Sequence, residues 1–341
     1  MSKYNSNMSG SDFEPSFTAT PADQSSVAKM DRQASMLPND DPEIQPDPMR
    51  GDMEAEKGIS KSKLYVRRFM RNKPAVLGLL VLLFLIIAAI VGPYLTKYEW
   101  NELDFMALSQ PPSAEHPFGT NEAGADLLAQ ILHGLGRSLT IALCVSFATT
   151  IISAFIGSAA AYFGGRVEKV MLGIIHFLLI IPSFLILALV VSHTGGDWKI
   201  LILALIAFGW MYYSRVIWSL AMSIREREYV KAARFMGVSS ANIIARHIIP
   251  NIGSLLIVNL TLGVVSTVMS ETGLSFLGLG VKIPDVSLGT LLQGGASVLY
   301  SSPWLFYFPA GVLTLLTVSM ALISDGLRDA LDPNSAAGGK A

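Results

Sequence analysis

The chain has 341 residues, of which 51% are hydrophobic and 15% charged, and its formal net charge at pH 7 is −1. A soluble domain of this length with a positive mean hydropathy would be hard to keep folded and dispersed, so the composition excludes an ordinary soluble protein and favours a membrane protein. The single cysteine, Cys144, excludes a disulfide framework and a paired-cysteine metal site.

Residues 1–60 are rich in Ser, Asp, Pro, Asn and Gln and contain few large apolar side chains. A segment of this kind buries too little apolar surface to offset the entropy of ordering it, so we expect a disordered cytoplasmic tail. The tail lacks the apolar core and the small-residue cleavage site of a secretory signal. We therefore expect it to remain attached to the chain.

A basic segment and the first membrane span are predicted over residues 61–95. The basic side chains before the apolar run are Lys61, Lys63, Arg67, Arg68, Arg71 and Lys73. Such a cluster holds its end of a helix on the cytoplasmic side of the membrane. From Pro74 to Leu95 the chain carries no charge, and that length suffices to cross a hydrocarbon core of about 30 Å at about 1.5 Å per residue.

Further charge-free runs predict five more spans, which makes six in all. They cover residues 138–163, 170–191, 200–214 with an extension to 224, 252–270 and 304–324. The uncharged stretch 286–303 is interrupted by Gly, Ser and Pro, which suits a re-entrant or surface helix better than a seventh span.

The charges between the spans predict the orientation and the domain organisation. The charged residues within 96–136 are mostly acidic, so this segment belongs outside, whereas the loop 225–251 is basic and belongs in the cytoplasm. We expect a five-helix core over residues 137–324 and a cytoplasmic tail over residues 325–341. Both chain termini are then cytoplasmic.

The cytoplasmic loop 225–251 has the pattern of a helix, a tight turn and a second helix. Residues 225–236 are good helix formers, and Gly237 suits the left-handed position that ends a helix. Ser239 or Ser240 can cap the next helix, which Pro250 is expected to stop.

Composition alone leaves two interpretations of this loop. The small side chains of Ala232 and Ala233 offer a surface that another protein can approach closely. The alternative is an amphipathic helix that rests on lipid headgroups.

The loop resembles the EAA loop of ABC importer permeases, in which Ala-Ala is followed four residues later by Gly and further on by Pro. Lys231 and His247 depart from the general pattern of that loop. The resemblance implies a coupling helix seated in a groove of an ATPase subunit, so that closure of two ATPases moves the membrane helices. The residues that it assigns to ATPase docking are Glu228, Tyr229, Ala232, Ala233, Met236, Gly237, Val238 and Pro250.

Three other stretches are similar to the C-type permeases of dipeptide, oligopeptide and nickel importers. They are HPFGTNEAGADLLAQILHGLGRSL at residues 116–139, ETGLSFLGLGVKIP at residues 271–284 and SDGLRDALDP at residues 324–333. Together with the loop, the resemblance extends over nearly everything from Leu64 to Pro333. It implies an all-α polytopic membrane protein with six transmembrane helices, the type I ABC importer permease fold.

The resemblance also implies a function and a set of partners. The chain is expected to be a multi-pass permease subunit of the cell membrane, surrounded by lipid, which forms a pathway for dipeptide or oligopeptide uptake with a paralogous permease. It would have no ATPase site, metal or cofactor of its own, because ATP and Mg would be bound by two ATP-binding-cassette ATPase subunits. An extracytoplasmic substrate-binding protein would deliver the substrate, and no nucleic acid is expected as a partner.

Other functions remain open from the sequence. The same architecture could import nickel, since the nickel members share these motifs. An ion-coupled secondary transporter usually has several ionisable groups at mid-membrane, and this chain has few. A structural membrane protein would have no use for the Ala-Ala-Gly loop. The chain contains no GxxxxGK[ST] phosphate loop and no GxSxG elbow, which agrees with ATP hydrolysis on separate subunits.

Glu271 is a further candidate site, at the outer end of the fifth span. A carboxylate near the membrane is costly and usually faces protein or water. Glu271 is therefore a candidate for lining the translocation path, with capping of nearby backbone as the alternative.

Overall fold

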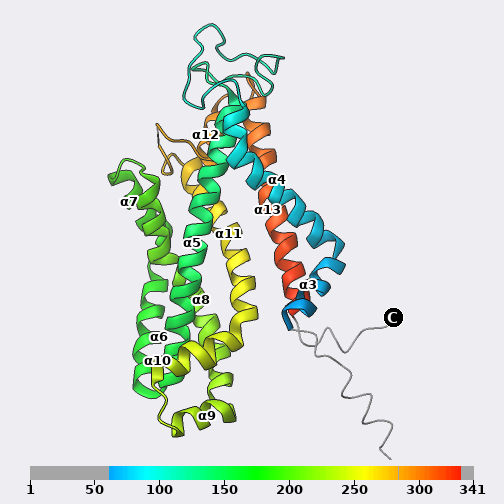
Figure 1. Ribbon diagram of the computed structural model, residues 1–341. Helices are drawn as coiled ribbons and strands as arrows, with labels where there is room; N and C mark the ends of the chain where they lie inside the picture. The colour runs from blue at the N-terminus through cyan, green and yellow to red at the C-terminus, as the bar shows by residue number, and fades with distance from the viewer. Residues whose placement is uncertain (1–60, 283, 332–341) are drawn as a thin grey trace, which may run out of the picture. The chain divides into compact units, whose positions relative to one another are not determined.

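A computed structural model describes residues 61–282 and 284–331 of the chain (Figure 1). In chain order the helical elements are α3 (Lys61–Arg71), α4 (Lys73–Leu95), α5 (Leu127–Phe163), α6 (Gly165–Ile180), α7 (Ser183–His193), α8 (Trp198–Arg225), α9 (Glu228–Phe235), α10 (Ser240–Ile243), the π turn η1 (Ile244–Ile248), the 3-10 turn η2 (Ile249–Ile252), α11 (Gly253–Phe276), α12 (Leu288–Ser297) and α13 (Trp304–Leu331). These ranges contain no strand, and the predicted all-α class is confirmed. The expected tail 1–60 and residues 332–341 of the expected C-terminal tail lie outside the described residues.

Five continuous helical stretches in the described part are long and apolar enough to cross a membrane. They are α4, α5, α8, the stretch from α10 through α11, and α13. A sixth crossing is formed by α6 and α7 if this pair counts as one span, which gives the predicted number of six.

The pair α6 and α7 is bent by 69° where the sequence predicted an uninterrupted span over residues 170–191. Pro182 follows α6 and has no backbone N–H to continue the helix. Ile181, the residue before it, is extended at φ −70° and ψ 127°, as the steric demand of a following proline favours. The segment predicted as the third span is therefore two helices with a bend between them.

The helices extend beyond the charge-free runs that identified the spans. α5 begins at Leu127, well before residue 138, because Asp126 caps it by accepting a hydrogen bond from the backbone N–H of Ala129 at 2.8 Å. α13 likewise continues past residue 324 to Leu331. A charge-free run marks the part of a helix that suits lipid, whereas the helix itself can continue with polar side chains beyond it.

The predicted helix stop at Pro250 is wrong. The chain stays helical from α10 through η1 and η2 into α11, and Pro250 stands in the first turn of η2. A proline in the first turn of a helical segment costs no hydrogen bond, and the π turn just before it rearranges the ladder. Pro250 thus changes the type of helix without ending it.

α5 is in contact with most of the other long helices. One apolar cluster joins it to α4, α11, α12 and α13, and a second joins it to α7, α8 and α11. Along α8 the approach is close, because a Cβ at Gly157 would lie 2.5 Å from the carbonyl oxygen of Ser214. The small residues around Gly157 therefore serve helix packing within the chain.

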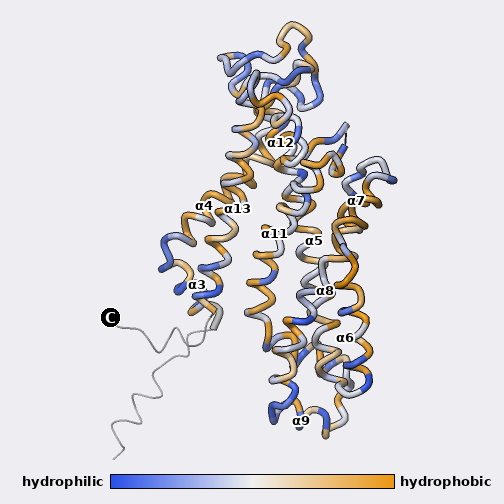
Figure 2. Tube along the Cα trace, turned by 180° about the vertical axis from the view of Figure 1, so that it is seen from behind, coloured by the Kyte–Doolittle hydropathy of each residue, from blue (hydrophilic) through white to orange (hydrophobic). Residues whose placement is uncertain are grey.

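Two polar regions lie at opposite ends of α5. Residues 96–126 precede its first turn, and α9 packs near its last turn through Ala161 and Tyr162. Figure 1 shows these two regions at opposite ends of the helices, and Figure 2 shows that hydrophilic residues gather in both, with hydrophobic residues along the helices between them. This arrangement fits a protein that crosses a membrane along the direction of α5.

Candidate functional site

The predicted loop helix exists as α9, and the chain itself covers one face of it. Val230 and Ala233 are buried in an apolar cluster with Tyr162 of α5, Ala221 of α8 and Ile248 of η1. These two positions are three residues apart and share a helix face. α9 is therefore seated on the ends of α5 and α8.

The rest of the surface of α9, together with its C-cap residue Met236, is exposed and partly apolar. We call the exposed residues Glu228, Tyr229, Ala232, Phe235 and Met236 the α9 outer face. Phe235 is 90% exposed, Met236 76% and Tyr229 43%. Large apolar side chains clustered in a polar loop are a usual sign of a surface that another molecule covers.

The left-handed turn at Gly237 ends α9 as predicted. Gly237 has φ +77°, and its N–H donates to the carbonyl of Arg234 at 3.1 Å. The N–H of Val238 donates to the carbonyl of Ala233 at 3.1 Å, which completes a Schellman motif. Val238 then packs back onto the same cluster as Ala233.

Charged side chains form hydrogen bonds and ion pairs where α8 ends and α9 begins. Arg225 donates from Nη1 to the carbonyl of Ala161 at 2.8 Å, which ties the end of α8 to α5. Its Nε lies 3.1 Å from one oxygen of Glu226, and Lys231 Nζ lies 3.1 Å from the other. The hydrogen bond from Lys231, and then that from Arg225, lower the pKa of the Glu226 carboxyl, because both favour its charged form.

The residues that the resemblance assigns to docking do not share one surface. Glu228, Tyr229, Ala232, Met236 and Gly237 are exposed. Ala233 is buried and Val238 half-buried, so both support α9 from beneath. Pro250 is exposed but belongs to η2 and not to α9.

Phe235 was not among the predicted site residues, although the sequence contains a signal for it. On a helix whose buried face is given by Val230 and Ala233, position 235 lies about 140° from position 230 at 100° per residue. An aromatic residue on that side cannot share the buried face. The helical periodicity of the loop therefore indicates Phe235 as an exposed aromatic residue.

Glu271 is 1% exposed, inside α11. Its Oε1 accepts hydrogen bonds from the hydroxyls of Ser275 and Ser287, each at 2.6 Å. Ser287 also caps α12 by accepting from the backbone N–H of Thr290 at 3.2 Å, so the carboxyl joins α11 to the start of α12. These contacts resemble the alternative interpretation, in which Glu271 stabilises nearby structure by hydrogen bonding, although its partners are hydroxyls and not backbone groups. Its role in lining a translocation path stays a prediction.

Metal-ligand geometry is not found in the part of the chain that the structure describes. No group of three or more His, Cys, Asp or Glu side chains there could hold a metal ion. Histidine and acidic side chains near the start of α5 form pairs instead, as in His116 with Asp126, whose Nδ1 and Oδ2 lie 2.9 Å apart.

Comparison with known proteins gives consistent matches. Residues 128–336 match the family described as binding-protein-dependent transport system inner membrane component, and residues 60–112 match the N-terminal TM domain of oligopeptide transport permease C. The oligopeptide transport system permease protein OppC of Mycobacterium tuberculosis (strain H37Rv) is 47% identical over 278 residues, covering 81% of this chain and 96% of that protein.

Two more distant relatives agree with these matches. The protein of the same name from Escherichia coli (strain K12) is 35% identical over 269 residues, covering 78% of this chain and 89% of that protein. The dipeptide transport system permease protein DppC of Bacillus subtilis (strain 168) is 34% identical over 268 residues, covering 78% of this chain and 84% of that protein.

Proposed function

The chain belongs to the binding-protein-dependent transport inner membrane component family, and from that premise we propose that it is a C-type permease subunit that imports dipeptides or oligopeptides. As a family member it is a multi-pass inner-membrane subunit of an ABC importer and not an enzyme, because the ATPase activity lies on separate subunits. The names of the relatives support a peptide as cargo and do not favour nickel or ion-coupled transport.

The observation that carries the ATP-driven part of this proposal is the α9 outer face. Burying a large apolar side chain stabilises a contact by about 1.5–3 kcal/mol, and exposed aromatic residues are frequent anchors of protein interfaces. Phe235 and Met236 are of this kind and lie in a polar loop between spans. The proposed occupant is a groove on an ATPase subunit.

The contacts beneath α9 support a mechanical role. Val230 and Ala233 bury against α5 and α8, and Arg225 ties α8 to the carbonyl of Ala161. A force applied to the α9 outer face would therefore reach two membrane-crossing helices directly. Movement of packed helices as rigid elements is a known form of coupling.

The remaining partners follow from the same proposal. A paralogous permease would complete the pathway, two ATP-binding-cassette ATPases carrying ATP and Mg would dock from the cytoplasm, and an extracytoplasmic binding protein would deliver peptides. The family's description as binding-protein-dependent supports the last of these. Both termini of the chain would be cytoplasmic.

Purification of the chain in detergent tests the docking proposal. We expect an ATPase to co-purify, and the double variant Phe235→Ser, Met236→Ser to reduce the amount by about tenfold or more, because two apolar anchors are lost. ATP-dependent uptake of tri-alanine should fall with it. Tyr300→Ser changes another fully exposed aromatic residue, outside α9, and should leave both measurements unchanged. Uptake that persists without the ATPase would contradict the proposal.

A further inference from the structure

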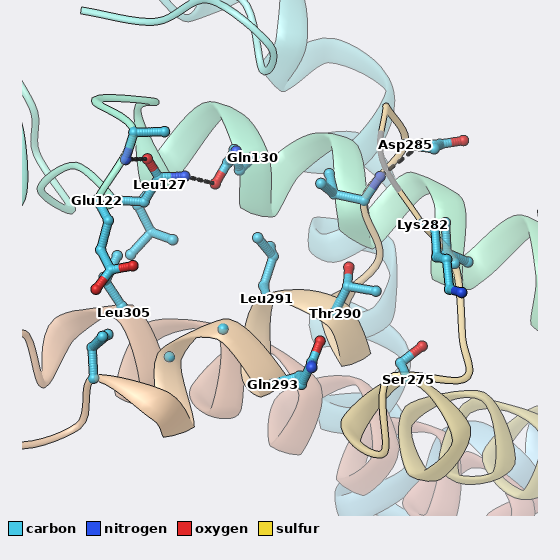
Figure 3. A pocket seen from close by; sticks show the side chains of 18 of the residues that line it. Glu122, Leu127, Gln130, Ser275, Lys282, Asp285, Thr290, Leu291, Gln293 and Leu305 are labelled. Carbon is cyan, nitrogen blue, oxygen red and sulfur yellow. Dashed lines mark hydrogen bonds between the residues drawn. The ribbon is translucent and has the colours of Figure 1, made fainter. Parts of the chain in front are cut away.

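A cavity of about 710 Å³ lies at the end of the helices where residues 121–123 precede α5 (Figure 3). Its lining comes from three regions that are far apart in the sequence. They are residues 121–130 at the start of α5, Gly195 between α7 and α8, and residues 275–282 and 285–305, from the end of α11 through α12 to the start of α13. A cavity of this size is typical of sites for small ligands.

Two charged side chains on this wall have no ion-pair partner among the described residues. Glu122 and Lys282 both line the cavity, and both are exposed. Figure 3 shows Glu122 at one side of the cavity and Lys282 at the other. The ion pairs found in the described ranges involve neither of them.

The third charged group of the wall is already neutralised. Asp285 Oδ2 lies 2.6 Å from Arg137 Nη2, and its Oδ1 lies 2.9 Å from His133 Nε2. Arg137 stacks in turn over the ring of Trp198, 4.0 Å from its centroid. The charges left for a ligand are therefore one carboxylate and one ammonium, held apart on opposite walls.

The wall between these charges combines amides and apolar groups. Gln293 supplies an uncharged donor and acceptor, and Gln130 supplies an amide whose oxygen also accepts from Asn121 Nδ2 at 3.3 Å. The hydroxyl of Thr290 is used within the α12 cap, where it donates to the carbonyl of Ser287 at 2.9 Å. Leu291 and Leu305 supply apolar surface. The backbone of a bound peptide needs hydrogen-bond donors and acceptors along its length. Its side chains, which differ from one peptide to the next, need apolar surface that accepts different side chains.

We infer that this cavity receives a short peptide with both termini free, with Glu122 binding the ammonium terminus and Lys282 the carboxylate terminus. The inference rests on the proposed function and names the features of the peptide that this chain itself recognises. Hydrogen bonds between charged groups are directional and about twice as strong as neutral ones, so a blocked terminus loses a specific contact. The two termini are read by different residues and can be tested separately.

Uptake by the complete complex in proteoliposomes, with its binding protein present, is the test. The probes are tri-alanine, N-acetyl-tri-alanine and tri-alanine amide. Lys282→Gln should lower the uptake rate of the two peptides with a free carboxylate by about three- to tenfold, as expected for a charged hydrogen bond partly screened by water, and leave the amide at its wild-type rate. Glu122→Gln should lower uptake of the two peptides with a free amine and leave the acetylated one unchanged.

For each peptide, the uptake rate of a variant is divided by that of the wild type. Because the same binding protein is present in every sample, its own preference among the three peptides cancels in this ratio. Glu99→Gln and Lys199→Gln are matched controls, because both residues are exposed and neither lines the cavity. The charge-preserving variants Glu122→Asp and Lys282→Arg should keep the wild-type order of the three peptides, which separates loss of charge from loss of folding.

The outcomes distinguish this inference from the proposed function. Equal loss of all three peptides would mean that the two charges contact another protein, and would overturn the inference while import stands. Unchanged rates in both variants would overturn it as well. Absence of ATP-dependent uptake by the wild-type complex would instead refute the proposed function, and the inference with it.

Discussion

Glu271 shows how a buried carboxyl is used within a membrane-spanning helix. Oε1 accepts from the hydroxyls of Ser275 and Ser287, while Oε2 is buried and has no hydrogen-bond partner among the described residues. Removing the acceptor would leave two buried hydroxyls to find new partners, each at a cost of about 1–3 kcal/mol. The carboxyl group therefore contributes through the oxygen that links α11 to α12.

Substitutions of Glu271 separate a structural role from a role in the path. Glu271→Gln keeps an oxygen in the place of Oε1, so we expect wild-type thermal stability of the purified complex and near wild-type uptake. Glu271→Ala should lower the free energy of unfolding by about 2–4 kcal/mol, because it removes the acceptor and leaves a void. Ser270→Ala, at an exposed neighbouring position, is the control. A Glu271→Gln complex that is fully stable but no longer imports would show that the carboxylate acts on the substrate.

At the scale of the element, α9 depends on how it is fixed at one face and at its C-terminal end. With 8 residues it is too short to be stable alone. Burial of Val230 and Ala233 holds it in place, and the turn at Gly237 returns the chain to the bundle. The orientation of Phe235 and Met236 therefore depends on this packing and on the left-handed turn at Gly237.

Gly237→Ala tests that dependence. A Cβ there meets no atom within 4 Å, so the penalty is the left-handed backbone alone, about 1–2 kcal/mol. We expect less ATPase to co-purify and slower ATP-dependent uptake. Gly237→Asn should be milder, because Asn tolerates this conformation.

Gly253→Ala provides the matched control for this experiment. Gly253 has ordinary helical geometry at φ −55° and equally open surroundings, so its replacement should have no effect on docking. Equal effects of Gly237→Ala and Gly253→Ala would contradict the role of the left-handed turn.

The elements also show which local predictions a sequence supports. The end of α9 was predictable because Gly237 and Val238 satisfy a capping pattern that needs only neighbouring residues. Pro250 and Pro182 look alike in the sequence, yet one is accommodated in a continuous helical stretch and the other accompanies a 69° bend. The difference lies in the flanking backbone, where η1 rearranges the hydrogen bonds before Pro250 while Ile181 becomes extended before Pro182.

At the scale of the whole molecule, the order of the spans was predictable because hydropathy and charge act along the chain. The cavity was not, because it joins segments that only folding brings together. The contact of Arg137 with Asp285 pairs residues in α5 and in the loop before α12, and no local pattern indicates it. The sequence also does not show that Asp285 pairs with Arg137 and His133, which leaves Glu122 and Lys282 without an ion-pair partner among the described residues.

The proposed orientation places Glu122 outside and Ser239 in the cytoplasm, because the loop that contains Ser239 is basic and residues 96–136 are acidic. Single cysteines at these two positions, in a Cys144→Ala background, test this with a membrane-impermeant maleimide. Both side chains are exposed, so burial would not prevent labelling.

In intact cells whose outer barriers the reagent can pass, Glu122→Cys should be labelled and Ser239→Cys should not. Inside-out vesicles should give the opposite result, and the cysteine-free background should stay unlabelled in both. Labelling at Ser239→Cys from outside would place the α9 outer face where no ATP is available. That result would leave the six-span arrangement intact but remove the route by which an ATPase could drive it.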